Sequence, residues 1–544
     1  MNTDCLITTK GYKNEKSKNL DILYIEDFIG FGNVNEGRTL TNEIFFSNKE
    51  FIKKYDYEGY KLTWSWYDQI YQISLKYSEI VDLIWELENK NYNLISIEGI
   101  HPLYEKVIRL YFFEKQIKTS KKINLKKNIK IFSINSILLF FTFSSLIYFS
   151  IKKKKYVAIR TEDMIYKKTQ SDFRLSHLYH ELKNNNIDFI EFVRSRSLKD
   201  FAKNTFRRKR FSIYYDSITY FVKLFNKKTF YKEKPKNFQE SILFEYANEN
   251  IILSKSIKYI KLIFRLCNID KFVLISFGSR SASLSFAAKS LNIKIIGIMH
   301  GQSMKENMAH EFMENYNEKK YIGPDIYGVW SRDWVHYFHK FCKIVPKENI
   351  VCSGLLRPID NYIFKNNNKF QSIDNNKIRI LLLSEQAVSA KEIWPYIEQI
   401  LLCNRYELSI KVRPMIKDKF YEELKDLSPM IEKLNFYEGD IFEVGKKIDI
   451  FLGTYSTAVI EASLINKISI LLKTVKWGDT YNMNKIIKNE NLLVDSPSEI
   501  CENIEYRVKN EFKLNSINII KNTFFGNNND GAKWIINQIL LDEN

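Results

Sequence analysis

The chain has 544 residues, of which 45% are apolar, 15% aromatic and 27% charged. At roughly 150 residues per domain, this length allows about three or four structural units. The composition is typical of a globular protein and excludes an intrinsically disordered chain and a polytopic membrane protein. The net charge of +19 fits nucleic acid, anionic lipid or a phosphorylated substrate, so the position of the excess charge has to decide between them.

Much of the positive charge lies in residues 121–155, which contain nine lysines and no acidic residue. These lysines bracket residues 131–151, a run of 21 residues without a charge. As a helix this run would be about 31 Å long, which matches the hydrocarbon thickness of a bilayer. Because lysines flank it on both sides, the positive-inside rule gives no orientation, and the pattern favours a helix that lies on or dips into an anionic leaflet.

A fully buried core helix is the alternative for residues 131–151. A single span would place residues 1–130 across the membrane from the rest of the chain. If both flanks belong to one domain, the segment must therefore re-enter or stay at the interface. The basic run at residues 207–210 lacks the interleaved aromatic residues of a nucleic-acid platform. We expect an anionic membrane surface as a partner and no nucleic acid.

The first strand-like runs are at residues 21–26 and 94–98, and between them residues 64–87 carry apolar positions at helical spacing. From residue 156 onward, apolar runs and helical segments alternate. We predict strands at residues 156–160, 187–193, 272–277 and 293–300, and helices at residues 172–182 and 281–291. This alternation with short turns implies parallel pairing in an α/β architecture.

A second alternation of strands and helices follows the polar run at residues 365–377. We predict strands at residues 378–384, 408–412, 449–452 and 468–472, and helices at residues 394–402 and 457–465. The chain then divides into an N-terminal domain at 1–355, which includes the membrane-associating segment 121–155, a linker at 356–377, a C-terminal domain at 378–525 and a terminal helical segment at 526–544.

The most informative motif is at residues 449–472. An apolar strand leads through Gly453 and a run of hydroxyl side chains to a helix start, where free backbone N–H groups can hold a phosphate. Thr454, Ser456 and Thr457 would add hydroxyl donors, and Glu461, one turn later, could accept hydrogen bonds from ribose. An ordinary N-capped helix with a solvated glutamate is the alternative.

Two further candidate sites lie at strand ends. His300 ends a predicted strand and precedes Gly301, a position where an imidazole can serve as an acid, a base or a phosphate ligand. Lys411 and Arg413 end another strand and would face a donor phosphate. The alternatives are a structural histidine and exposed loop charges.

Taken in order, the segments GIMHGQ, WSRDW, IVCSGLLRP, ILLLSEQ, KVRP, EGDIFEVGKKIDIFLGTYSTAVIEA and ISILL resemble GT-B glycosyltransferases. Among these, the chain looks most like bacterial surface-polysaccharide transferases, a neighbourhood that includes Kdo and sialic acid transferases and the CDP-glycerol glycerophosphotransferases of teichoic acid synthesis. The resemblance covers roughly residues 270–475. It implies two Rossmann-like domains facing a cleft, an acceptor-side N-terminal domain, a nucleotide-donor C-terminal domain and a last helix that crosses back.

The resemblance also implies roles for individual residues. His300 matches the histidine of the family's His-Gly pair, which is catalytic or stabilises phosphate. Ser456 and Thr457 match the hydroxyl pair that receives the donor phosphate, and Glu461 matches the glutamate beside the nucleotide. One departure is that these families often carry His-Pro or Arg-Pro-His-Pro where this chain has Arg-Pro-Met at residues 413–415, which puts CMP- or CDP-linked donors in doubt.

We therefore expect a membrane-associated glycosyltransferase of the capsule or lipopolysaccharide type, which moves a sugar from a nucleotide-sugar donor to a lipid-linked or growing glycan. No metal or other cofactor is expected. Six scattered cysteines without a CxxC pair favour a reducing compartment, so we expect the cytoplasmic face of the cytoplasmic membrane. The alternatives are a CDP-glycerol or polyol phosphotransferase and a non-catalytic membrane scaffold of the same fold.

Overall fold

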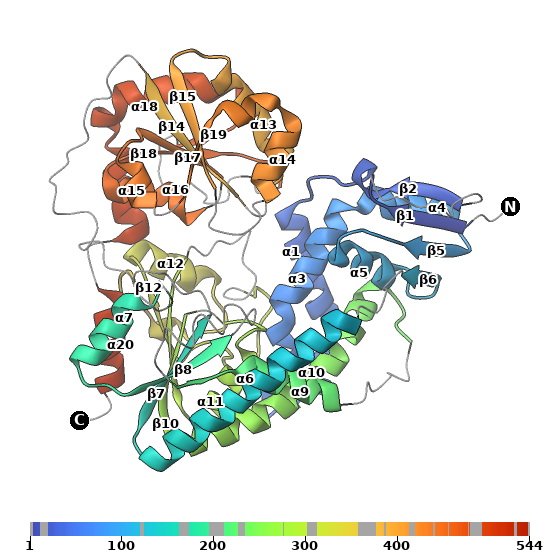
Figure 1. Cartoon of the computed structure of the whole chain (residues 1–544), viewed down its shortest axis with the longest axis vertical. Helices are drawn as coiled ribbons and strands as arrows, with labels where there is room; N and C mark the ends of the chain where they lie inside the picture. The colour runs from blue at the N-terminus through green and yellow to red at the C-terminus, as the bar shows by residue number, and fades with distance from the viewer. Residues whose placement is uncertain are drawn as a thin grey trace.

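The computed structural model describes residues 4–10, 20–119, 125–162, 172, 174–194, 211–226, 234–275, 277–301, 313–356, 377–385, 388–412, 419–438, 441–454, 456–476, 478, 492–526 and 530–541. In this part of the chain, strands form three parallel sheets of four, seven and six strands and one antiparallel pair. Figure 1 shows the six-stranded sheet above the seven-stranded sheet, with the four-stranded sheet to one side. The predicted linker at 356–377 lies almost entirely outside the described residues.

The N-terminal segment forms its own small sheet, in the order β2-β1-β5-β6. Its strands are β1 (Asp4–Thr8), β2 (Leu20–Tyr24), β5 (Leu94–Ile97) and β6 (Gln116–Thr119). The other elements of this segment are α1 (Val34–Ser47), α2 (Lys49–Lys54), the pair β3 (Asp56–Tyr57) and β4 (Tyr60–Lys61), α3 (Tyr67–Glu79), α4 (Val81–Lys90) and α5 (Pro102–Tyr111). The two predicted strand-like runs are β2 and β5, and the predicted helical stretch is divided into α3 and α4.

The seven-stranded sheet has the order β13-β12-β11-β10-β7-β8-β9. Its strands are β7 (Tyr156–Glu162), β8 (Phe189–Arg194), β9 (Ser212–Ile213), β10 (Ile269–Leu274), β11 (Lys294–Ile298), β12 (Ile326–Val329) and β13 (Ile350–Cys352). The helices that follow these strands are α7 (Ser176–Asn184), α9 (Tyr215–Phe225), α10 (Phe238–Leu266), α11 (Ala282–Ser290) and α12 (Arg332–Phe341). Counted from β7, the order is 3-2-1-4-5-6-7, a Rossmann-like winding.

The six-stranded sheet has the order β16-β15-β14-β17-β18-β19, which counted from β14 is the Rossmann order 3-2-1-4-5-6. Its strands are β14 (Ile378–Leu383), β15 (Tyr406–Lys411), β16 (Asn435–Tyr437), β17 (Ile450–Gly453), β18 (Ile468–Leu472) and β19 (Leu493–Val494). Its helices include α13 (Ala390–Leu401), α14 (Lys419–Leu427), α15 (Ile441–Gly445), α16 (Thr457–Glu461), α18 (Ile500–Leu514) and α19 (Ser516–Ile520). The predicted fold class, two Rossmann-like α/β domains with a hydrophobic helix in the N-terminal half, is confirmed.

The central strands are continuous apolar runs because helices cover both faces of each sheet. All five residues of β18 are buried, for example, and so are the four residues of β17. After the six-stranded sheet the chain returns to the first Rossmann-like domain. There the last helix, α20 (Gly531–Leu540), contacts α7 and β11. Its residues Ile535 and Ile539 share a core with Val157 of β7.

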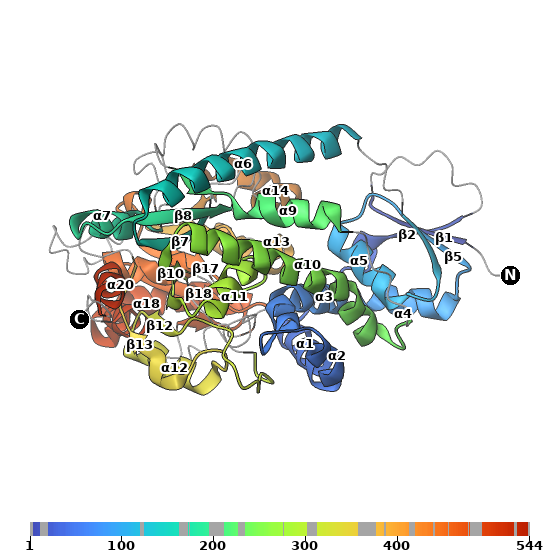
Figure 2. The same ribbon diagram turned by 90° about the horizontal axis from the view of Figure 1, so that it is seen from below.

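The lysine-flanked segment forms α6 (Leu125–Lys152), a helix of 28 residues that lies along the surface of the seven-stranded domain (Figure 2). One stripe of α6 faces the protein: Leu138, Thr142, Leu146 and Phe149 are buried, and the Thr142 hydroxyl accepts a hydrogen bond from the Tyr214 N–H at 3.0 Å. Ile134 and Leu139 are half-buried beside this stripe, and most of the other apolar side chains of α6 are exposed. Because only 22% of its most apolar window is buried, the alternative of a fully buried core helix is wrong.

A buried ion pair joins the N-terminal segment to the six-stranded domain. Glu79, the last residue of α3, is 4% exposed and contacts the ammonium groups of Lys76 and Lys476, the latter at 2.7 Å. Burial opposes ionisation of this carboxyl, but the two lysines outweigh burial and lower its pKa. A backbone hydrogen bond joins the same two parts of the chain, because the Val34 N–H donates to the Lys476 carbonyl at 3.2 Å.

Candidate functional site

The best-placed residues for binding a ligand lie at the carboxyl edges of the two large sheets. In an open parallel sheet, ligands bind outside the strand ends where the strand order reverses, because the two neighbouring connections leave in opposite directions. In the six-stranded sheet this switch point is between β14 and β17, and in the seven-stranded sheet it is between β7 and β10. The donor residues predicted from the sequence follow β17 or, like Lys411, end β15, and His300 follows β11.

At the β14–β17 switch point, the loop after β17 is held by an acidic side chain. Oε1 of Glu385, two residues after β14, accepts hydrogen bonds from the backbone N–H groups of Thr454 at 3.3 Å and Ser456 at 3.2 Å. Gly453 is required here, because a Cβ at that position would lie 2.7 Å from Val459 and 3.3 Å from the same carboxylate oxygen. The amides expected to bind phosphate therefore bind a carboxylate in this structure.

Ser456 is the N-cap of α16, and its hydroxyl accepts from the Ala458 N–H at 3.4 Å. The helix has five residues and continues as a 3-10 turn from Ala462 to Ile465. Thr454 is 3% exposed, and its hydroxyl has no hydrogen-bond partner among the described residues. Thr457 and Glu461 are partly exposed.

Lys411 is the last residue of β15, next to β14, and is partly exposed. Arg413 lies outside the described residues. The structure therefore brings Thr454 and Ser456 together with Glu385, and it places Lys411 on the same edge, at the end of the strand next to β14. Sequence analysis included Glu385 in the ILLLSEQ segment but gave it no role, because its partners follow a strand about 70 residues later.

His300 follows β11, and its Nδ1 lies 2.6 Å from the backbone carbonyl oxygen of Ile275. A carbonyl only accepts, so Nδ1 carries the proton and Nε2 is the nitrogen with the basic lone pair. The imidazole is exposed. The backbone before it is fixed independently of the ring, because Met299 bonds to the Gly328 carbonyl and to the Trp330 indole N–H.

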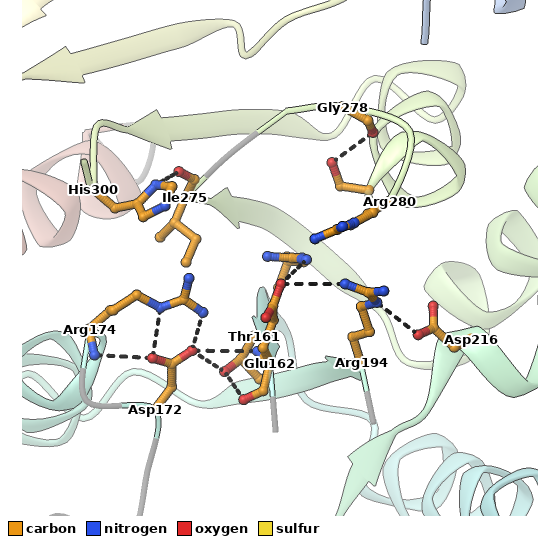
Figure 3. A network of polar contacts seen from close by, with 12 residues as sticks. Thr161, Glu162, Asp172, Arg174, Arg194, Asp216, Ile275, Gly278, Arg280 and His300 are labelled. Carbon is orange, nitrogen blue, oxygen red and sulfur yellow. Dashed lines mark hydrogen bonds and ion pairs between the residues drawn. The ribbon is translucent and has the colours of Figure 1, made fainter. Parts of the chain in front are cut away.

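The edge that carries His300 also carries a charged cluster that was not predicted from the sequence (Figure 3). Glu162 ends β7, Arg194 ends β8, Asp216 is in the first turn of α9, and Arg280 follows β10. No group of three or more His, Cys, Asp or Glu side chains within the described ranges could hold a metal ion. Its arginine side chains carry the planar N–H donors that suit an oxyanion.

We expect Ser456→Ala/Thr457→Ala and, separately, Glu461→Ala to weaken nucleotide binding, because each removes hydrogen bonds to a charged ligand, worth about 1.5–3 kcal/mol each. Isothermal calorimetry with nucleoside diphosphates measures the loss. Ser428→Ala is a matched control, since Ser428 also caps a short helix through the N–H two residues later, at 3.2 Å. Unchanged nucleotide affinity in both test variants would remove this edge as the donor site.

No family model and no curated protein sequence matches the chain. Solved structures that match it include a UDP-GlcNAc 2-epimerase from Neisseria meningitidis bound to UDP-GlcNAc (12% identity, 71% of this chain and 100% of that chain, TM-score 0.44). They also include a glycosyltransferase from Rickettsia africae (15%, 72% and 100%, TM-score 0.45) and the lipopolysaccharide outer core galactosyltransferase WaaB (13%, 72% and 100%, TM-score 0.44). The assignment of the fold rests on the two strand orders described above.

Proposed function

We propose that this protein is a membrane-associated glycosyltransferase of the GT-B type, which transfers a sugar from a nucleotide-sugar donor to a lipid-linked or growing surface glycan. The observation that carries the proposal is that one chain contains two Rossmann-order sheets. The carboxyl edges of these two sheets carry different polar groups, one set suited to the donor and one to the acceptor. The edge of the six-stranded sheet offers hydroxyls and Lys411 for donor phosphates. The edge of the seven-stranded sheet offers an exposed imidazole with a defined tautomer.

The proposed reaction uses these two edges together. Nε2 of His300 accepts the proton of an acceptor hydroxyl, whose oxygen forms a bond to the anomeric carbon of the donor sugar. The bond from that carbon to the phosphate oxygen breaks, and the nucleotide leaves with its negative charge. Lys411 and the hydroxyls of Ser456 and Thr457 stabilise this charge.

Membrane association is proposed for α6. Its inner stripe packs on α9 and β9, so a helix that crossed the bilayer would carry part of the folded domain with it. Its outer face presents large apolar side chains, with Phe140 68%, Ile147 61% and Ile151 73% exposed. The lysines at its end, Lys152–Lys155, are exposed, and Lys154 also pairs with Asp188. This pattern supports a helix that lies in the interface of an anionic leaflet, on the cytoplasmic face of the membrane.

The test is a mass-spectrometric screen of nucleotide-sugar consumption by the purified protein with anionic vesicles and a glycan or lipid-linked acceptor. The proposal expects acceptor-dependent loss of one nucleotide sugar and release of its nucleotide. Consumption of CDP-glycerol with transfer of phosphoglycerol would replace the proposal with a phosphotransferase. Nucleotide binding without turnover of any donor would indicate a scaffold.

A further inference from the structure

Three arginines converge at the switch point of the seven-stranded sheet. Arg160 lies on β7, Arg194 ends β8, and Arg280 follows β10. Figure 3 shows the side chains of Arg194 and Arg280 directed toward the same place from two different connections. Like charges close together repel each other, most strongly where one of them is buried, as Arg160 is, so a stable cluster needs negative charge in or beside it.

The acids within the cluster supply only part of that charge. Nη2 of Arg160 donates to Oε1 of Glu162 at 2.9 Å, and Nε of Arg194 lies 3.3 Å from Oδ2 of Asp216. The same Oε1 of Glu162 also forms a longer ion pair with Nη1 of Arg194, at 3.8 Å (Figure 3). Arg280 makes no ion pair within the part of the chain that the structure describes. Three arginines and two acids leave a net charge of +1. Desolvation raises the pKa of Asp216 to about 6, despite the opposing effect of Arg194 and Arg160, so Asp216 loses its charge on mild acidification.

Two donor atoms of the cluster are buried without a hydrogen-bond acceptor among the described residues: Nε of Arg160 and Nη1 of Arg194. The ion pair of that Nη1 with Glu162, at 3.8 Å, is too long for a hydrogen bond. The Arg160 side chain is only 3% exposed. Buried guanidinium donors are rarely left unpaired, because each forfeits a hydrogen bond to water. By contrast, the neighbouring Arg174 is satisfied, since its Nε and Nη2 donate to both oxygens of Asp172 at 2.9 and 2.6 Å.

We propose that Arg160, Arg194 and Arg280 bind an oxyanion group of the acceptor substrate, a phosphate or a carboxylate. The planar guanidinium matches such a group through two parallel N–H donors. The site is also close to the proposed base, because His300 follows β11, and β7 is two strands away at about 4.8 Å per strand. This inference rests on the proposed transferase function for the identity of the ligand, but not for the existence of the anion site.

The first experiment measures anion binding without donor or turnover, by calorimetry with the whole 544-residue chain. The probes are inorganic phosphate and dodecyl phosphate for the phosphate source, and methyl glucuronoside for the carboxylate source. Dodecyl maltoside and methyl glucoside are uncharged controls. We expect one charged probe to bind and its uncharged control not to bind. The charged probe that binds more tightly shows whether the natural ligand carries a phosphate or a carboxylate.

Arg194→Gln and Arg280→Gln should each weaken binding of that probe about 10- to 100-fold, the value of a hydrogen bond to a charged group. Arg194→Lys should lose an intermediate amount, because it keeps the charge but not the two-donor geometry. Asp216→Asn should bind about 3- to 10-fold more tightly, because it removes the acid that competes for Arg194. Both glutamine changes are at partly or fully exposed side chains, so the variants are expected to fold.

Arg405→Gln is the matched control, since Arg405 pairs with Glu505 at 2.8 Å in the other Rossmann-like domain. It removes the same charge and should bind the probe as the wild type does. The inference is overturned if Arg194→Gln and Arg280→Gln bind as tightly as wild type, or if the uncharged controls bind equally well. If the anion binds as expected but the protein consumes no nucleotide sugar, the proposed transferase function is refuted. The anion site at the three arginines is then still supported.

Discussion

His300→Ala should lower turnover by about two to four orders of magnitude, the usual contribution of a general acid or base. The expectation follows from the hydrogen bond between Nδ1 and the Ile275 carbonyl, which leaves Nε2 as the basic nitrogen. The variant should fold normally. Met299, the preceding residue, is held by main-chain and indole contacts that do not involve the imidazole.

Single-turnover kinetics with the donor found in the screen measure the effect, with nucleotide affinity and melting temperature determined in parallel. His336→Ala is the control, because His336 is an exposed histidine on α12 of the same domain. Near-normal turnover of His300→Ala would make His300 a structural residue. A large loss of stability without a specific kinetic defect would lead to the same conclusion.

The central strands of the two large sheets were predictable because they are buried on both faces. The shorter strands β9, β12, β13, β16 and β19, of two to four residues each, were not predicted. The run Ile-Arg-Ile-Leu-Leu-Leu of β14 and the run Ile-Ser-Ile-Leu-Leu of β18 are long enough to fill a central strand, and each is followed by polar residues. The small sheet was predicted only in part. β6 reads Gln-Ile-Lys-Thr with two exposed positions, and such a short alternating edge strand carries little hydrophobic signal.

Spacing along the chain could not predict the charged cluster. Arg160, Arg194 and Arg280 are separated by 34 and 86 positions and become neighbours only because β8 and β10 lie on either side of β7. Glu385 was missed for a similar reason, since β14 and β17 are adjacent in the sheet and distant in the sequence. The strand order brings together the charged cluster and, at the other sheet, Glu385 and its partners. It depends on how the helices pack on the two faces of each sheet and not on any local sequence pattern.

Local patterns also leave the role of Ser456 open. The same hydroxyl that the resemblance assigns to donor phosphate accepts a hydrogen bond from the Ala458 N–H as an N-cap. A serine at a helix start serves either purpose with the same backbone geometry. Comparison with Ser428, which has only the capping role, separates the two in binding experiments.

Phe140→Glu/Ile147→Glu should release the protein from anionic vesicles. The two side chains are one heptad apart on the outer face of α6, and they are 68% and 61% exposed. Burying each in the acyl region is worth about 1.5–3 kcal/mol, so their loss weakens partitioning by about two to four orders of magnitude. Sedimentation with phosphatidylglycerol vesicles measures the change, and calorimetry should show unchanged nucleotide affinity, because neither residue contacts the donor edge.

Leu138→Glu is the contrasting variant, because Leu138 is 2% exposed on the inner stripe and packs against Val193 and Tyr214. It places a carboxylate in the core, so it should lower the melting temperature while the outward pair leaves it nearly unchanged. If the outward variant misfolds and the wild type ignores vesicles of every composition, α6 is not a membrane helix. If the wild type binds neutral and anionic vesicles equally, Lys152–Lys155 contribute nothing and the apolar face alone carries the affinity, because the lysine contribution requires anionic lipid.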